Sequence, residues 1–170
     1  IMQDFEDAGF KVLWYQLRGP RELTSNVPIN KASDLQGRKM RMSGNVLHNS
    51  MWTAAGAITS AIALSETFNA LSQGVVEMQE NPYDMIYDNS FYEVQKYVTR
   101  TGHIHMSSPI LMNKALFDSM PEKDQKAILQ AGREMGPIHT KMVADLEKQQ
   151  WDEIGGKYGM KITDVDKAPF

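Results

Sequence analysis

Two arginines and one asparagine are the residues whose types and positions best suit the binding of a small molecule. Arg41 lies in the stretch 38–42, where polar and apolar side chains alternate, and Ser43-Gly44-Asn45 follows it. Arg41 therefore stands near the carboxyl end of a predicted strand, where open α/β sheets bind their ligands. A guanidinium at that place could bind a carboxylate through two parallel hydrogen bonds.

Asn81 follows a second predicted strand, 75–78, and belongs to the turn Gln79 to Pro82. It could lie at the same edge of the sheet, where its amide would offer both a donor and an acceptor. Arg21, just after Gly19-Pro20, is the third polar candidate. The alternative is that both arginines are surface residues paired with nearby acids, and spacing alone favours this alternative.

Carboxylates that could act in catalysis have simpler explanations. Glu77 and Glu80 could form the pair of a hydrolase, but a spacing of three in an extended segment puts them on opposite faces. Solvent-exposed or capping roles explain them better. Glu66 opens a predicted helix, where its favourable interaction with the helix dipole is sufficient explanation.

No pattern for a metal, a cofactor or a nucleophile stands out. His103 and His105 would share one face of a strand, yet no third zinc ligand is evident nearby. The chain has no Gly-x-Ser-x-Gly, Walker A or Gly-x-Gly-x-x-Gly pattern. We therefore expect no cofactor, no bound metal and no enzymatic activity.

Composition limits the classes of partner. The 170 residues carry a formal net charge of −3 without a basic stripe, which argues against a nucleic-acid partner. The absence of cysteine excludes disulfides and thiolate chemistry, and no apolar run approaches the roughly 20 residues that span a bilayer. The chain opens at Ile1 as if within a helix and shows no signal peptide, so we expect a fragment or a processed chain.

Strands and helices are predicted to alternate, which favours an α/β fold with mainly parallel pairing. A Ser65 N-cap should begin one helix, and Pro137 should kink the long one. An apolar stripe through Ile128, Met135 and Met142 should dock the long helix onto its own domain. The predicted strands are 10–17, 38–42, 75–78, 103–107, 109–112 and 161–165, and the predicted helices are 1–9, 46–55, 65–74, 82–97, 115–120 and 121–154.

Five segments resemble the solute receptors of tripartite ATP-independent periplasmic (TRAP) transporters, the DctP family. They occur in the family's order and spacing, and they cover nearly the whole chain. The segments are 34–41 (DLQGRKMR), 68–76 (FNALSQGVV), 79–82 (QENP), 92–97 (YEVQKY) and 101–104 (TGHI).

The resemblance implies a fold of two α/β lobes with the ligand enclosed between them, and a long helix that spans both lobes. It assigns residues 1–18 and 107–147 to lobe one, and residues 19–106 and 148–170 to lobe two. Family members are longer than 170 residues, so the amino-terminal part of lobe one would be missing from this sequence.

The resemblance also implies the site residues. Arg41 matches the arginine that forms the salt bridge to the ligand carboxylate, and Arg21 matches a second arginine in a loop that here reads Gly19 to Asn26. Asn81 matches a ligand-contacting asparagine. In the family an aromatic residue often precedes the Ser-Glu of the middle helix; here Leu64 takes that position and Glu66 follows, and both are expected at the ligand.

The implied function is that of a periplasmic receptor. It would bind a small organic acid, either a C4-dicarboxylate or an acidic sugar such as a uronate, by closing its lobes on the ligand. It would then deliver the acid to the small and large permease components in the membrane. Two alternatives stay open, namely a ligand-sensing module of a signalling system and, less favoured, an enzyme that acts on carboxylates.

Overall fold

A computed structural model describes residues 2–168, and the chain divides into two compact units. Unit 1 comprises Ile1–Gly19 and Met106–Leu146, and unit 2 comprises Pro20–His105 and Glu147–Phe170. The candidate site residues all belong to unit 2. The helix α6 (Glu122–Asp152) contributes residues to both units. The prediction that these segments are the two lobes of the family fold stays a prediction.

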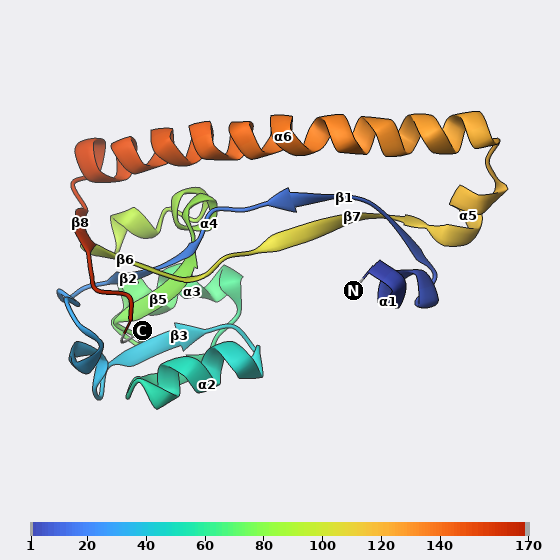
Figure 1. Ribbon diagram of the computed structural model, residues 1–170. Helices are drawn as coiled ribbons and strands as arrows, with labels where there is room; N and C mark the ends of the chain where they lie inside the picture. The colour runs from blue at the N-terminus through green and yellow to red at the C-terminus, as the bar shows by residue number, and fades with distance from the viewer. Residues whose placement is uncertain (1, 169–170) are drawn as a thin grey trace. The chain divides into compact units, whose positions relative to one another are not determined.

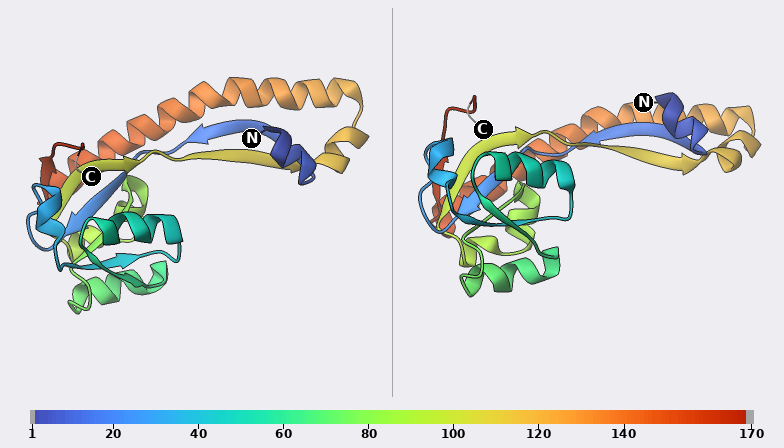
Figure 2. Two further views of the ribbon diagram at one scale, coloured as in Figure 1. Left: turned by 60° about the horizontal axis from the view of Figure 1, so that its bottom comes forward. Right: turned by 90° about the horizontal axis from the view of Figure 1, so that it is seen from below.

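Unit 1 is built on one antiparallel pair of strands, β1 (Phe10–Leu17) and β7 (Ser107–Asn113), which run side by side in both views of Figure 2. Two short helices, α1 (Met2–Asp7) and α5 (Lys114–Ser119), flank the pair. The amino-terminal part of α6 packs against β1 at Gly132. A Cβ at Gly132 would lie 2.7 Å from the carbonyl oxygen of Leu13, so only glycine permits this close approach.

The apolar stripe predicted on α6 is only partly buried, with Ile128 half-buried. Met135 and Met142, from the predicted apolar stripe, are exposed, together with Ile138 and Leu146. Gly132 lies four residues after Ile128 and three before Met135, so it shares their side of the helix, and it is buried against β1. The helix also continues through Pro137 without interruption (Figure 1).

Unit 2 is a six-stranded mixed sheet in the order β4-β3-β5-β2-β6-β8. β3 pairs in parallel with β4 and β5, and β6 pairs in parallel with β8, whereas β2 is antiparallel to both of its neighbours. Three of the five pairings are therefore parallel, in line with the general expectation of mainly parallel pairing. Its strands are β2 (Arg21–Ser25), β3 (Lys39–Met42), β4 (Ile58–Ala61), β5 (Met78–Pro82), β6 (Tyr97–Ile104) and β8 (Lys161–Asp164). Its helices are α2 (Val46–Ala54), α3 (Leu64–Ser72), α4 (Tyr83–Asp88), the short 3-10 turns Ala32–Leu35 and Phe91–Glu93, and a π turn at Glu153–Lys157.

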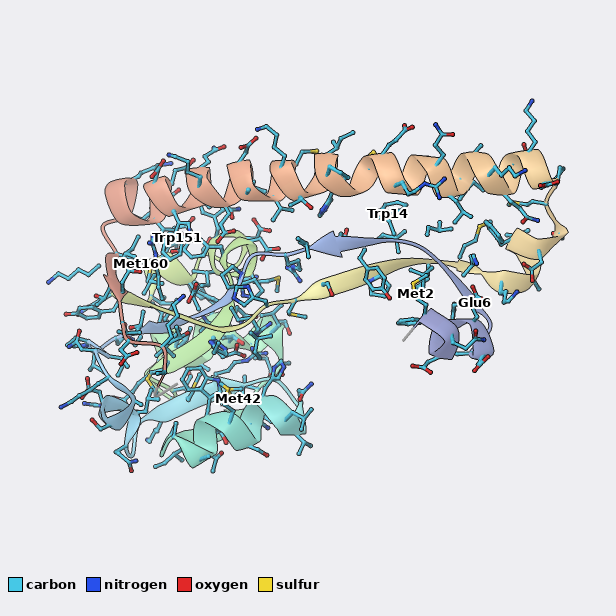
Figure 3. All side chains as sticks on the ribbon, viewed as in Figure 1. Met2, Glu6, Trp14, Met42, Trp151 and Met160 are labelled. Carbon is cyan, nitrogen blue, oxygen red and sulfur yellow. The ribbon has the colours of Figure 1, made fainter. Side chains whose placement is uncertain are left out.

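Helices cover both faces of this sheet. Trp52 of α2 packs against Met40, Met42 and Met78 in one core cluster. The helices α3 and α4 and the end of α6 form the other cluster. Its buried residues are Ala70, Leu71, Val76, Tyr83, Ile86, Phe91, Val98, Ile154 and Met160, and Trp151 packs against them (Met42, Trp151 and Met160 are labelled in Figure 3).

Several local predictions in unit 2 were wrong. The strand β4 was not predicted, the helix expected at 82–97 ends as an α-helix at Asp88, and the strand expected at 103–107 runs from Tyr97 to Ile104. The segment 21–25 forms the buried strand β2, although Gly19-Pro20 suggested a loop. The strand predicted at 75–78 begins only at Met78 and runs to Pro82, so Asn81 lies inside a strand. The N-cap of α3 is Ala63, with no side-chain hydrogen bond, instead of Ser65.

A carboxylate without a full counter-charge is buried in β2. The side chain of Glu22 is 3% exposed and accepts a hydrogen bond from the backbone N–H of Gly102 at 2.7 Å. Burial raises the pKa of Glu22 to about 7, against the opposing effect of that hydrogen bond and of the positive charges on Lys167 and Arg100. The folded protein therefore holds a proton on Glu22 at a pH where the unfolded chain has lost it.

This burial predicts a stability that falls as pH rises. Between pH 4.5 and 7 the folded state binds more protons at Glu22 than the unfolded state, so the free energy of unfolding should fall by up to about 3 kcal/mol. Denaturant unfolding at about pH 5 and pH 8 measures the fall. Glu22→Gln should remove most of it and the exposed Glu93→Gln none; an unchanged fall in Glu22→Gln would contradict the assignment.

Candidate ligand-binding site

Three neighbouring parallel strands bring the candidate residues to one edge of the sheet. Arg41 is the last residue but one of β3, and Asn81 is the last but one of β5. The segment 62–64 follows directly after β4. Because β3 is parallel to both of its neighbours, their carboxyl ends meet at this edge, which is where open α/β sheets bind ligands.

Arg41 is buried, and its guanidinium group makes few hydrogen bonds within the protein. Its side chain is 4% exposed, and its Nε–H donates to the carbonyl oxygen of Ile62 at 2.9 Å. Among residues 2–168, neither Nη atom of Arg41 has a hydrogen-bond partner. Burial lowers the pKa of Arg41, while the charge of Glu80 opposes this effect. Two N–H-bearing nitrogens are therefore positioned to bind an anion.

A pocket of about 360 Å³ opens in front of Arg41. This volume suits a small ligand. Leu64 contributes an apolar side chain to the lining. Glu66 is exposed on the first turn of α3 and does not line the pocket. The lining residues are Arg41, Ser43, Gly44, Ala61, Ile62, Ala63 and Leu64.

Arg21 is held by a carboxylate that the sequence did not pair with it. Its Nε and Nη2 donate to the two carboxylate oxygens of Glu80, and Nη2 also donates to the carbonyl oxygen of Glu80. Nη2 further donates to Oδ1 of Asn81 at 3.0 Å. Both partners of this ion pair are buried, so Arg21 is not the surface residue that spacing favoured.

Glu80 also contacts His103. The Nε2 atom of His103 lies 3.0 Å from a carboxylate oxygen of Glu80, and its Nδ1 atom lies 2.8 Å from the hydroxyl of Thr101. Burial raises the pKa of Glu80, but the hydrogen bonds and charges of His103 and Arg21 outweigh burial and lower it below its usual value. Glu80 is therefore a buried, charged anchor for Arg21.

The solvent-exposed or capping role expected for Glu80 was wrong, because Glu80 is fully buried and paired with Arg21. Glu80 lies between Gln79 and Asn81 in a segment that is buried at every position. A buried carboxylate needs a partner that compensates its charge. The polar run Gln79-Glu80-Asn81 does not reveal this burial, and nothing local pointed to Arg21, which is 59 residues away.

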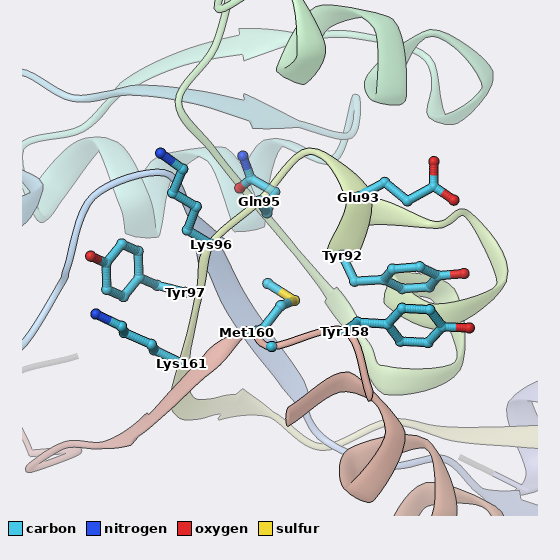
Figure 4. Close-up of a pocket in the computed structure, with 9 residues that line it drawn as sticks. Tyr92, Glu93, Gln95, Lys96, Tyr97, Tyr158, Met160 and Lys161 are labelled. Atoms are coloured by element: carbon cyan, nitrogen blue, oxygen red, sulfur yellow. The ribbon is translucent and has the colours of Figure 1, made fainter. Parts of the chain in front are cut away.

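A second pocket in unit 2 contains none of the predicted site residues. It has a volume of about 330 Å³ and lies beside β6 and β8. Figure 4 shows the rings of Tyr92 and Tyr158 stacked on one side of Met160, with Lys96 and Lys161 on the other. Gln95 also lines this pocket.

The described part of the chain shows no site for a metal ion. No group of three or more histidine, aspartate or glutamate side chains among residues 2–168 could hold one. Every helix in that range is also too short or too polar to span a lipid bilayer.

The whole chain matches one family model. The model of "Bacterial extracellular solute-binding protein, family 7", DctP, covers residues 1–170. A solute-binding protein from Verminephrobacter eiseniae is 36% identical over 171 residues, which is 100% of this chain and 51% of the relative. The chain thus spans about half the length of the curated relatives that it matches.

Solved structures of TRAP periplasmic solute-binding proteins share the fold. One from Sulfitobacter sp. NAS-14.1 with bound β-D-galacturonate is 27% identical, has a TM-score of 0.89, and is matched over 99% of this chain and 56% of that one. Another from Roseobacter denitrificans with bound L-galactonate is 31% identical, with a TM-score of 0.82 and the same coverage. The chain belongs to the DctP family of TRAP solute-binding proteins, with about half of their two-lobed α/β fold.

Proposed function

We propose that this chain is part of the periplasmic receptor of a TRAP transporter and that it binds a small organic acid. The observation that carries the proposal is the buried Arg41, whose two Nη atoms are unused and face a pocket of about 360 Å³. Bidentate, charge-assisted hydrogen bonds make such a guanidinium a strong and selective carboxylate partner. Units 1 and 2 would belong to lobes one and two, and the permease components would accept the ligand.

The other predicted residues stand at different distances from the pocket. Arg21 and Asn81 adjoin each other at the same edge of the sheet but do not line the pocket, whereas Leu64 lines it and would pack against the apolar part of a ligand. A ligand contact by Glu66 stays a prediction, because Glu66 is exposed and lies outside the pocket lining.

Charge favours a ligand with a single carboxylate over a C4-dicarboxylate. Glu80 compensates the charge of Arg21 at hydrogen-bond distance, and Arg38 and Arg100 also pair with carboxylates. Within the described part of unit 2, this leaves Arg41 as the guanidinium without a carboxylate partner. One such cation matches one carboxylate. Two similar structures hold sugar acids, β-D-galacturonate and L-galactonate, and these supply the chemical class.

The test is a thermal-shift panel on the protein purified with all the sequence that its gene encodes. D-Galacturonate and D-galactose form the matched pair, and L-galactonate, D-glucarate and succinate complete the panel. At about 100 times its dissociation constant, a ligand should raise the free energy of unfolding by about 2.7 kcal/mol. We expect shifts with the monocarboxylates and none with galactose. A shift with galactose, or none with any acid, would overturn the proposal.

A further inference from the structure

A chain of buried hydrogen bonds runs from Arg21 across the sheet, away from the candidate site. Arg21 donates to Oδ1 of Asn81, and Nδ2 of Asn81 donates to Oε1 of Gln79 at 2.6 Å. Nε2 of Gln79 donates to the hydroxyl oxygen of Thr24 at 2.8 Å, and that hydroxyl donates to Oε1 of Gln95 at 3.1 Å. All five side chains are buried.

The groups at the two ends of this series of hydrogen bonds fix the direction in which every member donates. A guanidinium can only donate, so Asn81 must turn its oxygen to Arg21 and its NH₂ group to Gln79. At the far end, Nε2 of Gln95 donates to the carbonyl oxygens of Val94 and Glu77, which can only accept. Reversing any single member would place two donors or two acceptors against each other.

The fixed orientation of the Asn81 amide determines which of its hydrogen-bonding groups remain for a ligand. Its Nδ2 atom carries two hydrogens, and one of them goes to Gln79. The second hydrogen has no partner within the residues that the structure describes. Asn81 is thereby held as a donor at the edge of the sheet where Arg41 also lies, outside the lining of the Arg41 pocket itself. An oxygen-rich acid that reaches both residues is the matching ligand.

We propose that Thr24, Gln79 and Gln95 are positioning residues that fix the amide of Asn81 in its donor orientation and thereby set the receptor's preference for acceptor groups. This inference rests on the proposed function, because it concerns the same site. It adds three residues that touch no ligand: Thr24 in β2, Gln79 in β5, and Gln95, which lines the second pocket (Figure 4).

Thr24 allows a clean test, because valine has nearly the shape of threonine but no hydroxyl. Thr24→Val removes the hydroxyl that joins Gln79 to Gln95 in the series of hydrogen bonds, whereas Thr24→Ser keeps it. Thr99→Val is the matched control: Thr99 is also buried in the sheet, and its hydroxyl donates to the carbonyl oxygen of Ile29, outside the chain. Calorimetric titration with D-galacturonate, or with the panel acid that gives the largest thermal shift, measures the dissociation constant.

We expect Thr24→Val to bind the acid about tenfold more weakly, as befits one well-placed hydrogen bond. Thr24→Ser and Thr99→Val should stay within about twofold of wild type. Equal affinities in Thr24→Val and Thr99→Val would overturn the inference and leave the receptor function intact. Failure of the unaltered protein to bind any acid would instead overturn the proposed function.

A second readout needs no ligand. The side-chain amide signals of Asn81 in nitrogen-15 spectra, assigned with Asn81→Asp, report whether its orientation is fixed. A single, slowly exchanging pair of N–H signals is expected in wild type and Thr24→Ser, and a broadened or doubled pair in Thr24→Val. Identical signals in all three proteins would show that Thr24 does not orient Asn81.

Discussion

Arg41→Ala is expected to weaken the binding of a monocarboxylate sugar acid by at least about a hundredfold. Removing one partner of a buried, hydrogen-bonded charge pair costs about 2–5 kcal/mol, and each 1.4 kcal/mol is a factor of ten. Arg41 meets the conditions for this large effect, since it is buried and its Nη atoms have no other partner among residues 2–168. Calorimetric titration with D-galacturonate gives the change directly.

Arg38→Ala is the matched control for that loss. Arg38 precedes the same strand, but its side chain is 41% exposed and pairs with Glu77. Its removal should leave the dissociation constant within about threefold of wild type. The dissociation constant of Arg41→Lys should lie between those of Arg38→Ala and Arg41→Ala, because an ammonium keeps the charge but not the planar guanidinium. Binding by Arg41→Ala at wild-type strength would remove Arg41 from the site.

The order of polar and apolar residues along short segments was enough to predict two of the strands and one edge of the sheet. The alternation around Arg41 predicted β3, and the rule for strand ends placed Arg41 and Asn81 at one edge of the sheet. The segment Phe10–Leu17 forms its strand with the predicted bounds, because aromatic and β-branched residues fit a pleated surface.

Features that depend on distant residues were not predictable in this way. The strand β2 looks like a loop from Gly19-Pro20 and is stabilised by β5 and β6, which come at least 50 residues later. The ion pair of Arg21 with Glu80 is equally remote, at 59 residues. The close approach of α6 to β1 at Gly132 also depends on a distant segment, since the backbone of Leu13 that Gly132 meets lies near the start of the chain.

Glu80→Gln is expected to lower the free energy of unfolding by about 3 kcal/mol near pH 7. The substitution keeps the shape of the side chain but leaves the charge of Arg21 buried without its counter-charge, and breaking a buried pair in this way costs about 3–5 kcal/mol. Denaturant unfolding measures the change. Arg21 would also lose one anchor of its position beside Asn81, so the stability loss and weaker binding should appear together.

Glu77→Gln is the control that tells the loss of the buried Arg21–Glu80 pair apart from the loss of an exposed glutamate nearby. Glu77 is three residues away and also pairs with an arginine, Arg38, but its side chain is 32% exposed, so its loss should cost less than about 1 kcal/mol. The pKa of Glu80 is lowered, so its charge stabilises the fold above the ordinary value of 4.5, and that contribution is lost as pH falls through the lowered pKa. The deficit of Glu80→Gln should therefore shrink in acid. A deficit equal to that of Glu77→Gln, or one independent of pH, would show that the buried pair with Arg21 does not stabilise this edge of the sheet.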